Sequence, residues 1–199
     1  MTTTNSRFNR RDMVYIAIFG TLWGLAEATL GALLHLLHVP LSGAILASIG
    51  MSIILIARRL NDRRGSTLLM ALLAASVKML SFSTVKLGPF VAILLEGMLL
   101  ELVLSLMGTG SMAFLVSALT TAAYPILQSV ATKSILFGKS FVPVILDLVA
   151  GFSERIGYQA GWWVLGIYLF LHLLIALAAA GFSWILLKRR DNQTEGFSP

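Results

Sequence analysis

Apolar residues fill most of this chain in long stretches, and short polar or basic segments separate them. The apolar stretches cover residues 13–37, 41–57, 67–82, 89–107, 111–136 and 162–187. Their lengths lie around the roughly 20 residues that an α-helix needs to cross the hydrocarbon core of a bilayer. The pattern therefore predicts an all-α integral membrane protein with six transmembrane helices in one domain, residues 1–199.

Basic residues mark the ends of these stretches and set the predicted orientation. They form three clusters: Arg7, Arg10 and Arg11; Arg58, Arg59, Arg63 and Arg64; and Lys188, Arg189 and Arg190. Cytoplasmic segments of membrane proteins carry an excess of Lys and Arg, so we expect all three clusters on the cytoplasmic side. An even number of crossings then separates each pair of clusters. Both N- and C-terminal segments, residues 1–12 and 188–199, are predicted to be cytoplasmic tails.

Residues 137–161 mix apolar runs with charges and a proline. We expect an outside loop with an interfacial helix, since a seventh crossing would place the Lys-Arg-Arg cluster outside. Trp162, Trp163 and Trp184 flank the last apolar stretch, as aromatic residues do at membrane surfaces. Pro125 lies inside the fifth stretch and predicts a kink there.

The composition agrees with a membrane protein and excludes several classes of function. Hydrophobic residues make up 57% of the 199 residues and charged residues 12%, whereas soluble domains average about 25% charged residues. The net charge of +6 is explained by cytoplasmic flanks that meet anionic membrane lipid, so we expect no nucleic acid partner. The lack of cysteine excludes disulfides and thiolate metal sites.

Six polar or charged residues lie inside the predicted helices, where an ionisable group costs about 2.5–3.5 kcal/mol at the bilayer centre. They are Glu27, Lys78, Glu96, Glu101, Gln128 and Lys133. At 1.5 Å per residue, all except Glu101 fall in the outer half of the membrane. One interpretation is a polar cavity, open to the outside, that binds a small polar solute. Its predicted contacts are Glu27, Lys78, Glu96 and Gln128, with Trp23 and Phe90 as stacking walls.

The other interpretation is that these charges only hold the helix bundle together. Glu27 would then pair with Lys78, and Glu96 with Lys133, as internal salt bridges. Glu101 lies deeper, toward the inner half of the membrane. Three roles stay open for it: a hydrogen bond between helices, a coupling residue, or a proton acceptor.

Small residues form a stripe along the first predicted helix. Ala17, Thr21, Gly24, Ala28 and Gly31 fall within about 40° of one line at 100° per residue. Such a stripe allows another helix to approach closely. It predicts either packing inside the bundle or a docking surface for a separate membrane subunit.

Residue patterns typical of catalysis or metal binding are scarce. His35 and His38 stand three residues apart, without a neighbouring ligand that would complete a metal site, so we interpret this pair as interfacial residues. His172 lies inside the last apolar stretch. The sequence has no Walker-type phosphate loop and no HExxH motif. We therefore expect no enzymatic activity, no cofactor and no metal, and an ATP-driven step would need another subunit.

The predicted protein resembles the S components of energy-coupling-factor transporters in four features. They are six helices, two cytoplasmic ends, a small-residue face on the first helix and an outward polar cavity. Gly88-Pro89, at the start of the fourth helix, is similar to the helix starts of that family. The resemblance implies capture of a vitamin-like micronutrient at the plasma membrane of a prokaryote. It also implies two ATPases and a transmembrane coupling subunit, which would dock on Ala17, Thr21, Gly24 and Ala28.

Two features depart from that family. Vitamin-binding members carry a sizeable loop between the first two helices, whereas only a few residues around Pro40 connect them here. Residues 137–161 would take that role. Nickel and cobalt members have a histidine after the initiator methionine, but this chain has Thr2, so a metal-ion cargo is not expected. Two other functions stay open: a structural or assembly protein of the membrane, and a self-contained proton-coupled carrier.

Overall fold

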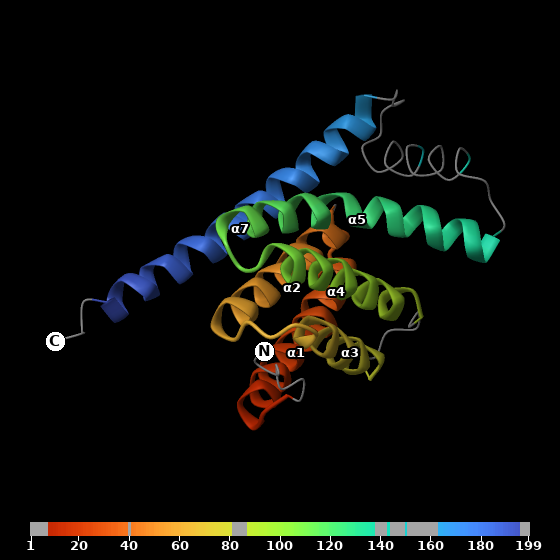
Figure 1. The fold of residues 1–199 in the computed structure, drawn as a ribbon. Coiled ribbons are helices and arrows are strands. Elements are labelled where there is room, and N and C mark those ends of the chain that lie inside the picture. Colours follow the sequence, from red (N-terminus) through yellow and green to blue (C-terminus); the bar gives the residue numbers. More distant parts are fainter. Residues whose placement is uncertain are drawn as a thin grey trace.

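The computed structural model describes residues 8–39, 41–80, 87–137 and 163–195, together with the single positions 143 and 150. The four continuous stretches contain six helices and no strand (Figure 1). The helices are α1 (Arg10–Leu36), α2 (Ser42–Leu60), α3 (Ser66–Met79), α4 (Leu87–Met107), α5 (Ser111–Phe137) and α7 (Trp163–Glu195). The predicted all-α class is confirmed for this part of the chain.

Four of the described helices are long and apolar enough to cross a membrane. The candidate spans are Arg10–Leu36, Ser42–Leu60, Gly88–Met107 and Gly166–Gln193. The 14 residues of α3 are also apolar, but this helix is only about 21 Å long, whereas the hydrocarbon core is about 30 Å thick. The lengths and the apolar composition of the described helices are therefore those expected of a membrane protein.

The centre of the bundle is α2. It contacts each of the other five described helices, and its Met51, Ile54 and Leu55 are fully buried. Around it, α3 packs against both α1 and α4, and α5 packs against both α4 and α7. The carboxyl-terminal part of α7, blue in Figure 1, extends beyond the other helices. Side chains that face α2 are therefore buried in the middle of the bundle.

The amino terminus of α1 begins at Arg10, before the predicted start at residue 13, because polar side chains cap it. The Asp12 N–H donates to Asn9 Oδ1 over 2.8 Å, and the Asn9 N–H donates to Asp12 Oδ2 over 2.9 Å. This reciprocal capping box satisfies two backbone donors that have no partner within the helix. Asp12 is consequently a buried part of the helix start rather than part of a polar tail.

Both α2 and α7 continue past the ends of their apolar stretches, to Leu60 and Glu195. Arg58 and Arg59 occupy the last turn of α2, where positive charge is favourable because the carboxyl end of a helix carries a partial negative charge. The basic cluster at residues 188–190 is helical as well. The predicted tail boundary at residue 188 therefore lies inside α7.

Two ion pairs bring the basic clusters to one end of the bundle. Arg63 Nε lies 3.0 Å from Asp12 Oδ2, which joins the segment after α2 to the first turn of α1. Arg59 Nη2 lies 2.9 Å from Asp191 Oδ2, which joins the end of α2 to α7. We call this part of the molecule, formed by residues 10–12, 58–64 and 188–191, the basic end.

Several predictions concern parts of the chain for which the structure gives little or nothing. Arg7, and residues 138–161 of the predicted outside loop apart from positions 143 and 150, lie outside the described residues. The interfacial helix predicted in this loop stays a prediction.

Within α5 the helix continues through Pro125.

Two residues of α7, Trp184 and His172, make contacts that place them within the bundle. The ring of Trp184 stands edge-on to Phe114, with 5.3 Å between the centroids, so this tryptophan belongs to the interface between α5 and α7. His172 is buried, and its Nδ1 lies 2.9 Å from the carbonyl oxygen of Tyr168. His172 thus lies inside α7, in the last predicted apolar stretch.

Candidate functional site

Trp23 of α1 and Glu96 of α4 converge on Gly50 of α2. The Trp23 side chain is fully buried, and Glu96 is 3% exposed. A Cβ on Gly50 would stand 3.1 Å from Glu96 Oε1 and closer still to Trp23 Nε1. The missing side chain of Gly50 therefore gives the indole its place against α2. The indole N–H and the carboxylate border the same point.

Neither of these polar atoms has a hydrogen-bond partner among the described residues. Trp23 Nε1 and Glu96 Oε1 are both shielded from solvent and unpaired. A buried polar group without a partner costs roughly 1–3 kcal/mol, and more when it is charged. Folded proteins keep few such groups, and each one calls for a ligand, a water molecule or a functional reason. A donor and an acceptor side by side can bind a polar group that offers both.

Glu27 and Lys78 pair with each other between α1 and α3. Lys78 Nζ lies 3.9 Å from Glu27 Oε2, and it also donates to the backbone carbonyl of Glu27. Each of the two side chains is 11% exposed. Gly31, about one turn after Glu27, leaves room for the ammonium, because a Cβ there would lie 2.7 Å from Nζ. The salt bridge predicted for this pair is confirmed.

Of the Glu27–Lys78 pair, Glu27 lies close enough to act electrostatically on Glu96. Glu27 and Glu96 are close enough for their negative charges to repel each other, while Lys78 attracts Glu27. Tyr124 of α5 lies near both carboxylates, but its hydroxyl donates to the Ala92 carbonyl oxygen over 2.6 Å. Among the described side chains, Glu96 therefore has no cationic partner.

The remaining predicted contacts are Phe90 of α4 and Gln128 of α5. Phe90 is half-buried and packs against the main apolar core, and Gln128 is half-buried on α5. The side chain of Lys133 lies outside the described residues, so its predicted bridge to Glu96 stays a prediction. Four of the predicted site residues are therefore connected by contacts or electrostatic interactions: Trp23, Glu27, Lys78 and Glu96.

One edge of the small-residue stripe on α1 packs inside the bundle. A Cβ on Gly24 would lie 2.7 Å from Val77 Cβ, so the helix backbones of α1 and α3 approach closely here. A Cβ on Gly20, four residues earlier, would lie 3.1 Å from the Met70 backbone. Gly20 and Gly24 have the spacing of a small-xxx-small contact. Gly20 was not part of the predicted stripe, although this spacing is visible in the sequence.

The other edge of the stripe is more open. Ala17 is exposed, and Thr21 and Ala28 are half-buried. The two interpretations of the stripe thus apply to different residues. Internal packing accounts for Gly24, and a docking surface for another subunit stays a prediction for the more open residues.

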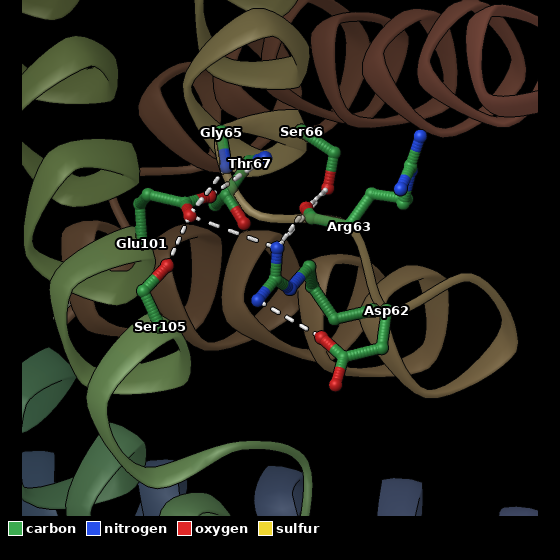
Figure 2. A network of polar contacts seen from close by, with 8 residues as sticks. Asp62, Arg63, Gly65, Ser66, Thr67, Glu101 and Ser105 are labelled. Carbon is green, nitrogen blue, oxygen red and sulfur yellow. Dashed lines mark hydrogen bonds and ion pairs between the residues drawn. The ribbon is translucent and has the colours of Figure 1, made fainter. Parts of the chain in front are cut away.

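A second buried polar network lies at the basic end and is built around Glu101 (Figure 2). Its carboxylate accepts from the Gly65 N–H over 2.6 Å and from the Thr67 N–H over 3.0 Å, and the Ser105 hydroxyl donates to it. These two backbone donors stand at the start of α3, which has no side-chain cap from its own N-cap residue, Gly65. Glu101 of α4 therefore caps α3.

Arg58 completes this network from α2. Its side chain is 1% exposed, and Nη1 lies 3.6 Å from Glu101 Oε1 while Nη2 lies 3.0 Å from Asp62 Oδ1. Of the three roles left open for Glu101, its contacts support hydrogen bonding between helices. The sequence did not reveal this cap, because its partners Gly65 and Thr67 lie 36 and 34 residues away along the chain.

The described residues contain no group of three or more His, Asp or Glu side chains arranged to hold a metal ion. Comparison of the chain with protein-family models, with curated proteins and with solved structures gives no match. The geometry around Gly50 is therefore the basis for a functional assignment.

Proposed function

We propose that this chain captures a small polar solute, such as a vitamin-like micronutrient, at the plasma membrane and delivers it through partner subunits. The observation that supports the proposal is the unpaired couple of Trp23 Nε1 and Glu96 Oε1 at Gly50. Pockets for small molecules combine apolar walls with a few polar groups that fix the ligand, and unpaired groups favour a ligand that completes their bonds. The further contacts that we propose are Glu27, Lys78, Gln128 and Phe90.

We infer six crossings of the membrane, with both ends of the chain on the cytoplasmic side. The four candidate spans and the meeting of the basic clusters at one end support this topology, because Lys and Arg collect on the cytoplasmic side. The two remaining crossings would come from α5 and from α3 extended beyond Met79. The basic end would then face the cytoplasm.

The energy for uptake would come from separate subunits, a transmembrane coupling protein and ATPases, as the resemblance to energy-coupling-factor transporters implies. The coupling protein would dock on the stripe of α1, of which Ala17 is the exposed residue. The solute binds first, and the bundle then reorients against the coupling protein. Neither step requires covalent chemistry by this chain.

A structural or assembly protein is the alternative, and one contact favours it. The Glu27–Lys78 bridge, 3.9 Å long, ties α1 to α3 without any ligand. This explanation does not extend to Glu96 and Trp23, because unpaired buried atoms destabilise a bundle. A carrier that moves protons through Glu101 is disfavoured, since that carboxylate is held by two backbone N–H groups and by Arg58.

Native mass spectrometry of the protein, extracted gently from the membrane of its own host, tests the proposal. We expect a small molecule to remain bound to the wild type and to be lost from Glu96→Gln. Asp62→Asn is the control, because this carboxylate is 51% exposed and lies in the segment after α2. Equal occupancy of the wild type and Glu96→Gln, or no bound molecule in either, would contradict a solute site at Glu96.

Cellular uptake of the molecule so identified provides a second measurement. Glu96→Ala should abolish uptake while the amount of protein in the membrane stays the same. Uptake at the wild-type rate by this variant would remove Glu96 from the site. Uptake by the purified chain alone in liposomes would favour a self-contained carrier over a subunit that depends on partners.

A further inference from the structure

The charges around Gly50 do not balance among the described side chains. Lys78 binds the side chain and backbone of Glu27, and His35 also acts on Glu27, whereas no described cation pairs with Glu96. Glu96, whose side chain is removed from solvent, is therefore the carboxyl group without a counter-charge among the described residues. A buried carboxylate is strongly unfavourable unless a cation pairs with it or a proton neutralises it.

The second unpaired atom adds a requirement on the ligand. The indole nitrogen of Trp23 is a donor only, and it stands beside the acceptor Oε1 of Glu96, with no side chain on Gly50 to separate them. The face of an indole also attracts a cation within about 6 Å of its centre. A ligand that satisfies both atoms carries a positively charged N–H group and a hydrogen-bond acceptor next to it.

We propose, on the basis of the proposed function, that the solute is an organic monocation whose protonated nitrogen binds Glu96 and whose neighbouring acceptor binds the N–H of Trp23. Amines, amidines and protonated nitrogen heterocycles with an adjacent acceptor belong to this class. Anions are rejected, because Lys78 is engaged by Glu27 and the carboxylate of Glu96 repels them.

Three probes of similar size and different charge test this assignment. At neutral pH 2-picolylamine carries an ammonium beside a ring-nitrogen acceptor, 2-pyridinemethanol is neutral, and picolinate is an anion. Binding to the full-length protein in nanodiscs is measured in two ways. The thermal unfolding midpoint is measured on the wild type. The emission of Trp23 is measured on a variant with Trp162→Phe, Trp163→Phe and Trp184→Phe. We expect picolylamine to bind about tenfold more tightly, or better, than either of the other probes.

Two variants connect this preference to the residues. Glu96→Gln should lose the preference for the cation, because the amide offers no negative charge. Asp62→Asn should keep it. The thermal measurement uses the wild type with all its tryptophans, so a loss of stability in the tryptophan variant does not affect it.

The outcomes separate this inference from the proposed function. A preference for picolinate or pyridinemethanol, or an anionic or neutral molecule found bound to the extracted protein, would overturn the cation assignment and leave the solute site in place. The assignment would also be overturned if the wild type showed no preference among the three probes and the Lys133→Met variant preferred the cation. Lys133 would then be the partner of Glu96. An extracted protein that holds no molecule removes the proposed function itself.

Discussion

Glu101 of α4 and Arg58 of α2 lie 3.6 Å apart at the basic end, and the same carboxylate accepts the backbone N–H groups at the start of α3. One buried anion thus joins three helices. Removal of one partner of a buried ion pair leaves the other charge uncompensated, which is far more destabilising than loss of an exposed pair.

We expect Glu101→Gln to lower the free energy of unfolding by about 3 kcal/mol. The amide keeps one acceptor for α3 but removes the charge that Arg58 faces. Reversible unfolding in mixed micelles, followed by circular dichroism, measures the change. Asp62→Asn, which removes a half-exposed partner of the same arginine, should change the stability by about 1 kcal/mol or less. Equal effects of both variants would contradict a central role for Glu101.

Gly50→Ala should destabilise the bundle by about 1–3 kcal/mol, because the added methyl group meets the rigid indole of Trp23. The same unfolding titration detects this change. Gly43→Ala is the matched control on the same helix, since nothing lies within 4 Å of its Cβ position, and it should be neutral or stabilising. In a Trp23→Phe background the smaller ring should reduce the penalty of Gly50→Ala. A penalty of unchanged size would show that the indole is not the obstacle.

The Glu27–Lys78 bridge should respond asymmetrically to its two single substitutions. Lys78→Met leaves the Glu27 carboxylate buried without the ammonium that pairs with it, whereas Glu27→Gln leaves the ammonium bound to the backbone carbonyl of residue 27. We therefore expect Lys78→Met to be the more destabilising change, by about 3 kcal/mol against the wild type. The double variant should be more stable than Lys78→Met alone. Additive effects in this double-mutant cycle would show that the two charges do not interact.

The two edges of the stripe on α1 should separate folding from assembly. Gly24→Val places a branched side chain against Val77 and should unfold or loosen the contact between α1 and α3. Ala17→Val changes an exposed position and should leave the unfolding midpoint unchanged. If α1 docks on a coupling subunit, Ala17→Val should weaken the copurification of that subunit. Ala17→Val that unfolds the bundle would contradict the exposed position of Ala17.

The apolar pattern predicted the positions of the described helices well and their ends less well. It set the start of the first helix at residue 13 because Arg10 to Asp12 are polar, although Asn9 and Asp12 have the spacing of a capping box. It ended the second helix before Arg58, but helices continue into polar residues wherever their last carbonyl groups find partners. Hydrophobicity locates the part of a helix that crosses a membrane, not the whole helix.

The candidate site could be predicted in part because depth along a helix can be calculated from residue number. Glu27 and Lys78 were both placed in the outer half of the membrane, and the structure pairs them. The approach of Trp23 and Glu96 to Gly50 could not be foreseen, because it depends on how α1, α2 and α4 rotate about their axes. The cap of α3 by Glu101 has the same origin in tertiary packing.

The five contacts of α2 restrict the motions that this protein can make. A tilt or slide of α2 would disturb every interface of the described bundle at once, at a cost that close-packed side chains do not tolerate. By contrast, α7 contacts only α2 and α5 among the described helices, and α1 only α2 and α3. Large conformational changes should therefore carry the centre of the molecule as a rigid body, with hinges confined to the periphery. Spin labels on α2 and α4 should keep a constant separation while a label on α7 moves.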